Sequence, residues 1–180
     1  MPIYRTQNRY WTPDDAEVAL AAILALITGA KAQIRVCAYG FTDPRITAAL
    51  IERRQAGVDT ALLLDYTQAC GPAEVAQVKR LKAADVPFWV GTSEKNHAIR
   101  HSKNIIADGE WAEIGSLNYS QTAFDQNNTV EIVRDRELAT EALRLWNKSK
   151  QWILDHQSDK QTDYLVKHFG DCPSPEKEKP

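Results

Sequence analysis

Apolar residues recur at two different spacings along this chain, and each spacing predicts a different kind of element. From Asp14 to Ala30 they fall three or four positions apart, which indicates one face of a helix that Thr12 and Pro13 begin. The continuous apolar run from Ala61 to Leu64 indicates a strand buried on both faces. Similar reasoning predicts helices over 14–30, 43–56, 73–84 and 136–155, and strands over 33–39, 58–65, 87–90, 104–107, 110–114 and 129–133.

The order of these elements predicts an α/β fold. Strands and helices alternate through the first half of the chain, which is typical of parallel strands joined by right-handed crossovers. The second half differs, because Asp108-Gly109 is a dipeptide typical of a two-residue hairpin turn between antiparallel strands. We therefore expect a mixed central sheet flanked by helices.

Composition and charge are those of an ordinary globular protein. The chain has 180 residues, of which 43% are hydrophobic and 26% are charged, and this balance suits a single domain. We expect that domain over 1–170, followed by a disordered tail over 171–180, where prolines and alternating charges prevent burial. The formal net charge of -2 gives no overall basic surplus, so an anionic substrate must be attracted locally.

The cysteines and the apolar segments bear on the compartment. Cys37, Cys70 and Cys172 show neither zinc-ligand spacing nor the pattern of a disulfide framework, which fits a reducing compartment. The N-terminus does not have the pattern of a secretory signal, and the longest apolar stretch, 16–27, is too short to span a bilayer. We expect a cytoplasmic protein without stable membrane association.

The most informative segment runs from His101 to Asn118. One residue separates His101 from Lys103, Asp108 follows after four more, and the tetrapeptide GSLN begins after a further six. In an extended segment the side chains of His101 and Lys103 share one face. The predicted hairpin then returns Ser116 and Asn118 to the same edge of the sheet.

This pattern resembles the signature of the phospholipase D superfamily, which is HxK, four residues, D, and then GSxN. The resemblance extends from roughly Thr12 to Val133, includes Phe41–Ile46, Gly57–Val58 and Asn127, and is to the small bacterial nuclease branch with one motif per chain. It implies a phospholipase D-like α/β/α sandwich and a metal-independent phosphodiesterase without a cofactor. It also implies a homodimer, because the family's mechanism uses two histidines.

Elementary chemistry leads to the same requirement for pairing. Cleaving a phosphodiester without a metal needs a nucleophile and a proton donor on opposite sides of phosphorus, with cations around the non-bridging oxygens. One motif supplies one histidine. Two copies about a two-fold axis would provide His101 twice, so that one ring attacks phosphorus and the other protonates the leaving oxygen.

Four side chains form the core of the predicted site. We expect His101 to act as nucleophile and as acid, Lys103 to hold the phosphate oxygens, and Ser116 and Asn118 to donate hydrogen bonds to them. Asp108 belongs to the same motif. We expect it to orient the motif or to support the dimer rather than to transfer protons.

One segment departs from the nuclease branch. Members of that branch tend to have a Glu-Asn pair shortly after GSxN, and the carboxylate orients the histidine ring. Here Asn127-Asn128 stands in the aligned segment. Glu131 lies further along, shares a strand face with Thr129, and is the candidate replacement for that carboxylate.

Three functions remain compatible with these residues. The leading one is an endonuclease for DNA or RNA, and the second is a phospholipid hydrolase or phosphatidyl transferase that uses the same histidines. The third is a non-catalytic module that binds nucleic acid or protein. No group of histidine, cysteine and carboxylate has metal-ligand spacing, so we expect no metal. Trp89, Trp111 and Tyr119 are candidates either for core packing or for substrate contact.

Overall fold

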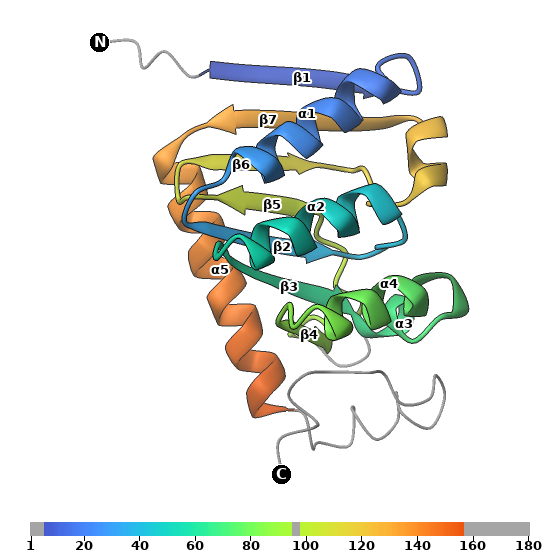
Figure 1. Ribbon diagram of the computed structural model, residues 1–180, viewed down its shortest axis with the longest axis vertical. Coiled ribbons are helices and arrows are strands. Elements are labelled where there is room, and N and C mark those ends of the chain that lie inside the picture. Colours follow the sequence, from blue (N-terminus) through green and yellow to red (C-terminus); the bar gives the residue numbers. More distant parts are fainter. Residues whose placement is uncertain (1–5, 95–97, 157–180) are drawn as a thin grey trace.

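The computed structural model describes residues 6–94 and 98–156. Within these residues, seven strands form one sheet in the order β1-β7-β6-β5-β2-β3-β4 (Figure 1). The strands are β1 Thr6–Thr12, β2 Gln33–Ala38, β3 Asp59–Asp65, β4 Phe88–Gly91, β5 Asn104–Ala107, β6 Trp111–Gly115 and β7 Asn128–Arg134. The helices are α1 Ala16–Gly29, α2 Pro44–Gln55, α3 Tyr66–Ala69, α4 Pro72–Ala83 and α5 Arg136–Asp155, with a 3-10 turn at Gln121–Asp125.

Helices cover both faces of the sheet. In β3, Leu62 and Leu64 point into the larger apolar cluster, which the sheet forms with α1, α2 and α4. Ala61 and Leu63 point the other way, into a smaller cluster with Trp146 and other residues of α5. Because successive side chains of a strand alternate between faces, the continuous apolar run of β3 is explained by burial on both sides. The predicted α/β/α sandwich with a mixed sheet is confirmed.

The directions of the strands gather several loop ends at one edge of the sheet. β2, β3 and β4 are parallel, whereas β5 is antiparallel to β2, β6 to β5 and β7 to β6. The ends of β2, β3 and β6 therefore lie at the same edge as the starts of β5 and β7. We call this the active edge, because the segment with His101 and Lys103 enters the sheet there.

The structure corrects the prediction for the N-terminal region. The sequence pattern gave no strand before the first helix, but β1 pairs antiparallel with β7. Thr12 ends that strand and does not cap α1: its hydroxyl donates to the carbonyl of Gln126 at 2.5 Å and accepts from the amide of Asn128 at 3.1 Å. The helix begins at Ala16 with Asp15 as its N-cap residue. Hydrogen bonding to a distant strand thus outweighs the local capping signal of Thr12-Pro13.

The hairpin between β5 and β6 is confirmed, but its turn is longer than predicted. Ala107 pairs with Trp111, so three residues connect the strands instead of two. Asp108 and Gly109 both have positive φ, at 54° and 63°, a region that Gly and Asp tolerate better than most residues. The Asp108 carboxylate accepts the amide N–H groups of Lys31, Ala32 and Gln33 at 2.8, 2.8 and 2.9 Å. Asp108 therefore ties the hairpin to the start of β2.

The cysteine prediction is wrong in one respect. Cys37 is free and buried, as expected of an unpaired thiol, but Cys70 is disulfide-bonded. A disulfide removes the argument for a reducing compartment, because such bonds persist mainly where the surroundings are oxidising. Cys172 and the expected tail over 171–180 lie outside the described residues. Among the described helices, none is long and apolar enough to cross a bilayer.

Asp108 should contribute measurably to stability. We expect Asp108→Ala to lower the free energy of unfolding at pH 7 by about 2–4 kcal/mol, because three amides lose a charged acceptor. Asp108→Asn should cost less, since Asn tolerates positive φ and keeps one acceptor oxygen. Urea unfolding followed by circular dichroism gives both values.

The pH dependence provides the control for this prediction. Partial burial raises the pKa of Asp108, but hydrogen bonds from the three amides outweigh it and the net pKa lies below the ordinary 3.8. The stabilisation is therefore present above that ordinary value and is lost as the pH falls below it. The gap between wild type and Asp108→Asn should narrow toward about pH 3. A gap that stays constant from neutral to acid would contradict the role of the ionised carboxylate.

Candidate active site

The structure brings the HxK segment to the active edge, immediately before β5. The peptide N–H of Arg100 donates to Asp65 Oδ2 at 2.6 Å, and Asp65 is the last residue of β3. This bond fixes the chain one residue before His101. The side chain of Arg100 is buried and donates to the carbonyl of Thr92 at 2.6 Å. His101 itself is exposed, so its ring is accessible to a substrate.

Lys103 is held more tightly than His101. The residue is 5% exposed, and its Nζ donates to the carbonyl of His101 at 2.6 Å. Burial lowers the pKa of Lys103 below its ordinary value, and the nearby Asp65 carboxylate opposes that shift. The ammonium is thus placed within the motif before any anion arrives.

Ser116 and Asn118 also lie at the active edge, each fixed by a hydrogen bond. Ser116 Oγ donates to Asn128 Oδ1 at 2.9 Å and accepts the amide of Thr129 at 3.1 Å. Asn118 Oδ1 accepts the amide of Gly40 at 3.3 Å, which leaves its amide nitrogen as a potential donor to a ligand. The loop after β6 is therefore bound both to β7 and to the loop after β2.

The tightness of this loop explains the glycine of GSLN. A Cβ at Gly115 would lie 2.0 Å from the carbonyl oxygen of Thr129. No side chain fits at that distance, so the strands β6 and β7 approach closely where the motif turns. Gly115 sets the close approach from which Ser116 and Asn118 are presented.

Two predicted residues lie away from these four. Asp108 is in the hairpin turn at the opposite end of β5, where it binds backbone amides. Glu131 lies on β7, which β6 separates from β5, and it forms an ion pair with Arg9 at 2.9 Å. The role of Glu131 in orienting His101 stays a prediction, and this ion pair weighs against it. Asn127 is exposed and lies one residue before β7.

Tyr39, which follows β2 directly, is a site residue that the sequence pattern did not predict. Its ring centroid lies 4.8 Å from that of His101, with an angle of 57° between the planes. Lys103 Nζ lies 5.0 Å from the centre of the same ring. Its position could have indicated a role, because Tyr39 ends a predicted strand that is parallel to the following strand, and ligands often bind at the carboxyl ends of parallel strands.

Two buried carboxyl groups support the loops of the active edge. Glu74 Oε2 accepts the amide of Phe41 at 2.7 Å, and Glu113 Oε2 accepts the hydroxyl of Tyr119. Burial raises the pKa of each carboxyl to about 8, so both are largely protonated at neutral pH. Tyr119 is fully buried, and its carbonyl also accepts the amides of Thr42 and Asp43, both at 2.9 Å. The alternative of core packing therefore holds for Tyr119.

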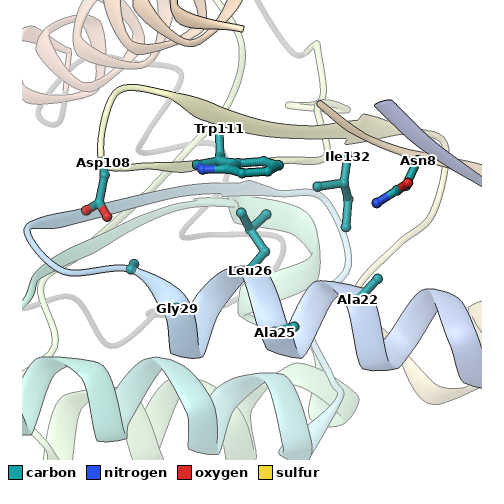
Figure 2. A pocket seen from close by; sticks show the side chains of 9 residues that line it. Asn8, Ala22, Ala25, Leu26, Gly29, Asp108, Trp111 and Ile132 are labelled. Atoms are coloured by element: carbon teal, nitrogen blue, oxygen red, sulfur yellow. The ribbon is translucent and has the colours of Figure 1, made fainter. Parts of the chain in front are cut away.

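Two pockets lie at different ends of the molecule. One of about 470 Å³ is lined by His101 together with Arg100, Ser102, Ser149 and neighbouring residues. The other, of about 340 Å³, lies between α1 and the sheet near Asp108 and Trp111, and Figure 2 shows Leu26 pointing into it. Trp111 thus lies at the Asp108 end of the hairpin, whereas the first pocket adjoins His101, and a smaller one of about 120 Å³ beside it is lined by Arg100, Ser102 and Asn104. Among the described residues, no three His, Cys, Asp or Glu side chains form a group that could hold a metal ion.

Comparison with known proteins finds relatives of this chain. A family model described as cardiolipin synthase, PLD-like domain, matches residues 23–149. Over 125 residues the chain is 33% identical to a phospholipase D from Rickettsia felis, covering 69% of this chain and 60% of that protein. The chain thus matches less than two thirds of that relative's length.

Solved structures have the same fold. Nuc, a phospholipase D family member from Salmonella typhimurium, matches with a TM-score of 0.74 and 27% identity, over 82% of this chain and 95% of Nuc. NucT from Helicobacter pylori matches with a TM-score of 0.75 and 20% identity, over 82% of this chain and 96% of NucT. At that identity the second match shows the fold alone.

The buried carboxyl of Glu113 should make stability depend on pH. Its folded pKa of about 8 lies above the ordinary 4.5, so the unfolded chain loses this proton first and stability falls as pH rises between those values. We expect Glu113→Gln to match wild type near pH 5 and to exceed its free energy of unfolding by up to about 4 kcal/mol near pH 9.

Denaturant unfolding at a series of pH values measures this difference. Glu74 has the same shift, so the variant keeps part of the wild-type dependence. Glu137→Gln, at an exposed position of α5, is the matched control and should change little at any pH. Parallel pH curves for wild type and Glu113→Gln would count against a protonated Glu113.

Proposed function

Since the chain belongs to the phospholipase D superfamily, we propose that it is a metal-independent phosphodiesterase, and specifically an endonuclease for DNA or RNA. The observation that carries the proposal is the pairing of an exposed His101 ring with a buried Lys103 ammonium at one edge of the sheet. Such a pair offers a nucleophile beside a fixed positive charge, which is what attack on an anionic phosphodiester requires.

The proposed reaction has two steps at phosphorus. A ring nitrogen of one His101 forms a bond to phosphorus while the bond to the leaving oxygen breaks, and a second His101 gives that oxygen a proton. Water then attacks phosphorus, the phosphorus–nitrogen bond breaks to release the first imidazole, and the proton of the water passes to the second imidazole. Lys103 balances the charge on the non-bridging oxygens in both steps, and Ser116 and Asn118 contribute hydrogen bonds.

The second histidine comes, in this proposal, from another copy of the chain. The described residues contain one HxK motif, and the predicted mechanism needs two imidazoles on opposite sides of phosphorus. A two-fold axis at the active edge would place two copies of His101 and Lys103 around one phosphate. Each homodimer would then hold one composite site. Asp108 acts in this proposal by fixing the hairpin, at a distance from the phosphate.

Hydrolysis of phospholipid is the second candidate. The Rickettsia felis relative is named phospholipase D, and the matching family model is described as a cardiolipin synthase domain. Both substrates present a phosphodiester, so the same four residues would serve either. Release of head group from phospholipid vesicles, measured beside DNA and RNA cleavage, separates the two. A non-catalytic binding module is the third candidate, and trapping a phosphohistidine on His101 would eliminate it.

One prediction of the proposed function concerns the chemical step. In buffer with EDTA, the purified chain should cleave DNA or RNA, and His101→Asn should lower kcat at least about 10³-fold, because the nucleophile is lost. His156→Asn, at the end of α5, is the matched control and should retain wild-type activity. Absence of cleavage by wild type at every pH from about 5 to 8 would sink the nuclease proposal.

Another prediction of the proposed function concerns the pairing of two chains. If each site needs His101 from both chains, an equal mixture of wild type and His101→Asn that has exchanged subunits should have about one quarter of the activity of wild type alone at the same total protein concentration. Independent monomers would keep about one half under the same conditions. Activity measured across the mixing ratios, together with mass by light scattering, decides between a square and a linear dependence on the wild-type fraction.

A further inference from the structure

We propose that Tyr39 is a positioning residue for the His101 imidazole and the Lys103 ammonium, and that Gln68 and Asp65 hold it in place. This inference rests on the proposed function for its effect on catalysis. The arrangement of the side chains that it describes can be measured independently of any activity.

The contacts of Tyr39 carry the proposal. Its ring lies 4.8 Å from the ring of His101 and 5.0 Å from Lys103 Nζ, measured between centres. These two groups are the predicted nucleophile and the predicted phosphate clamp, and one half-buried aromatic ring contacts both. An exposed imidazole can otherwise rotate about its side-chain bonds. A ring packed against one side of His101 restricts that rotation and leaves the other side for the substrate.

A chain of hydrogen bonds fixes Tyr39 in turn. Gln68 Nε2 donates to the Tyr39 hydroxyl at 3.1 Å and lies 3.3 Å from Thr67 Oγ1, to which it also donates. Thr67 Oγ1 donates to Asp65 Oδ1 at 2.6 Å. All three of these side chains come from the end of β3 and the short helix α3 that follows it.

Asp65 is where this chain meets the HxK segment. Its other oxygen, Oδ2, accepts the amide of Arg100 at 2.6 Å, one residue before His101. The carboxylate is fully buried, so it is shielded from competing water. Asp65 thus holds the backbone that leads into His101 and, through Thr67 and Gln68, the ring that packs on His101. Asp65 therefore restrains both the backbone and the ring that position the predicted nucleophile.

The chemical consequence is an imidazole with one preferred orientation. Displacement at phosphorus requires the attacking nitrogen to be aligned with the leaving oxygen, and a misplacement of 1 Å can cost roughly 100-fold in rate. Positioning of this kind affects kcat more than KM, because Tyr39 packs on the attacking ring, whereas Lys103 keeps its bond to the carbonyl of His101 when Tyr39 is replaced. If Tyr39 bound the substrate directly, its replacement would raise KM more than it lowers kcat.

Substitutions of Tyr39 separate the ring from the hydroxyl. With a chromogenic phosphodiester such as bis(p-nitrophenyl) phosphate, we expect Tyr39→Leu to lower kcat about 10- to 100-fold with KM changed by less than about twofold. Tyr39→Phe keeps the ring and should limit the loss of kcat to about 2- to 5-fold. Tyr10→Leu makes the same change at a half-buried tyrosine of β1 and is the matched control for packing loss. Thermal unfolding of each variant confirms that it is folded.

The hydrogen bond from Gln68 is tested by a double-mutant cycle. Tyr39→Phe removes this bond, and Gln68→Leu removes it together with the bond to Thr67, so Tyr39→Phe should lower kcat by a factor of about 2 to 5 and Gln68→Leu by at least as much. The double variant should be no slower than Gln68→Leu alone. If the factors by which the two single substitutions lower kcat multiply in the double variant, Gln68 does not act through Tyr39. A rise in KM without a fall in kcat for Tyr39→Leu would overturn positioning in favour of substrate binding.

A spectroscopic measurement keeps this inference distinct from the proposed function. The chain has four histidines, and the imidazole signals of His101 are identified by their loss in the His101→Ala variant. In wild type and Tyr39→Phe the ring protons of His101 should show the same aromatic shift, which Tyr39→Leu removes. If wild type hydrolyses nothing while these shifts behave as expected, the proposed function fails and the placement of His101 by Tyr39 stands. Unchanged shifts in Tyr39→Leu would overturn the inference even in an active enzyme.

Discussion

The antiparallel pairing of β5 with β2 is the constraint on which the active edge depends. Because Cys37 pairs with Asn104, β5 starts where β2 ends, and the residues just before β5 meet the residues just after β2. A parallel β5 would begin at the other edge of the sheet, displaced by roughly 3.3 Å for each residue of the strand. His101 and Tyr39 would then lie at opposite ends of the sheet. The switch from parallel to antiparallel strands at this position therefore creates the site.

Protonated carboxyl groups hold the loops that frame the site. Glu74 binds the loop after β2 through the amide of Phe41, and Glu113 binds the loop after β6 through Tyr119. Each has one oxygen without a hydrogen-bond partner, and an ionised carboxylate in such surroundings would be costly. The backbone of Tyr119 joins the two loops directly, since its amide donates to the carbonyl of Gly40 at 2.9 Å. The position of Asn118 thus depends on buried groups that must stay neutral.

Much of the fold could be predicted from the sequence, because its central elements have strong local signals. The apolar run of β3, the helical spacing of apolar residues in α1 and the hairpin dipeptide at Asp108 each gave an element that the structure contains. β1 was not predicted because its conformation depends on β7, more than a hundred residues away in the sequence. Its own residues do not indicate a strand without that partner. The helix α3 was missed because four residues are too few for a helical period.

The candidate site could be predicted only where its residues follow one another along the chain. His101, Lys103, Ser116 and Asn118 share one motif, and their placement at one edge followed from the hairpin. Tyr39 follows β2 and Asp65 ends β3, and the sequence signal for them was limited to their places at the ends of predicted parallel strands, which does not name His101 as their neighbour. Asn127-Asn128 in place of the usual Glu-Asn pair raised the question of which residue orients the histidine. The contact between Tyr39, after β2, and His101, before β5, arises only when these two strands pair in the sheet.

The bond between the Lys103 ammonium and the carbonyl of His101 affects how the site would take up an anion. A lysine on an open surface carries a shell of ordered water that an incoming phosphate must strip away. Lys103, at 5% exposure, has largely exchanged that shell for a peptide oxygen and the neighbourhood of an aromatic ring. Most of the dehydration therefore takes place when the chain folds. Under the proposed function, binding of a phosphate would exchange a neutral acceptor for a charged one, with little further loss of water from the ammonium.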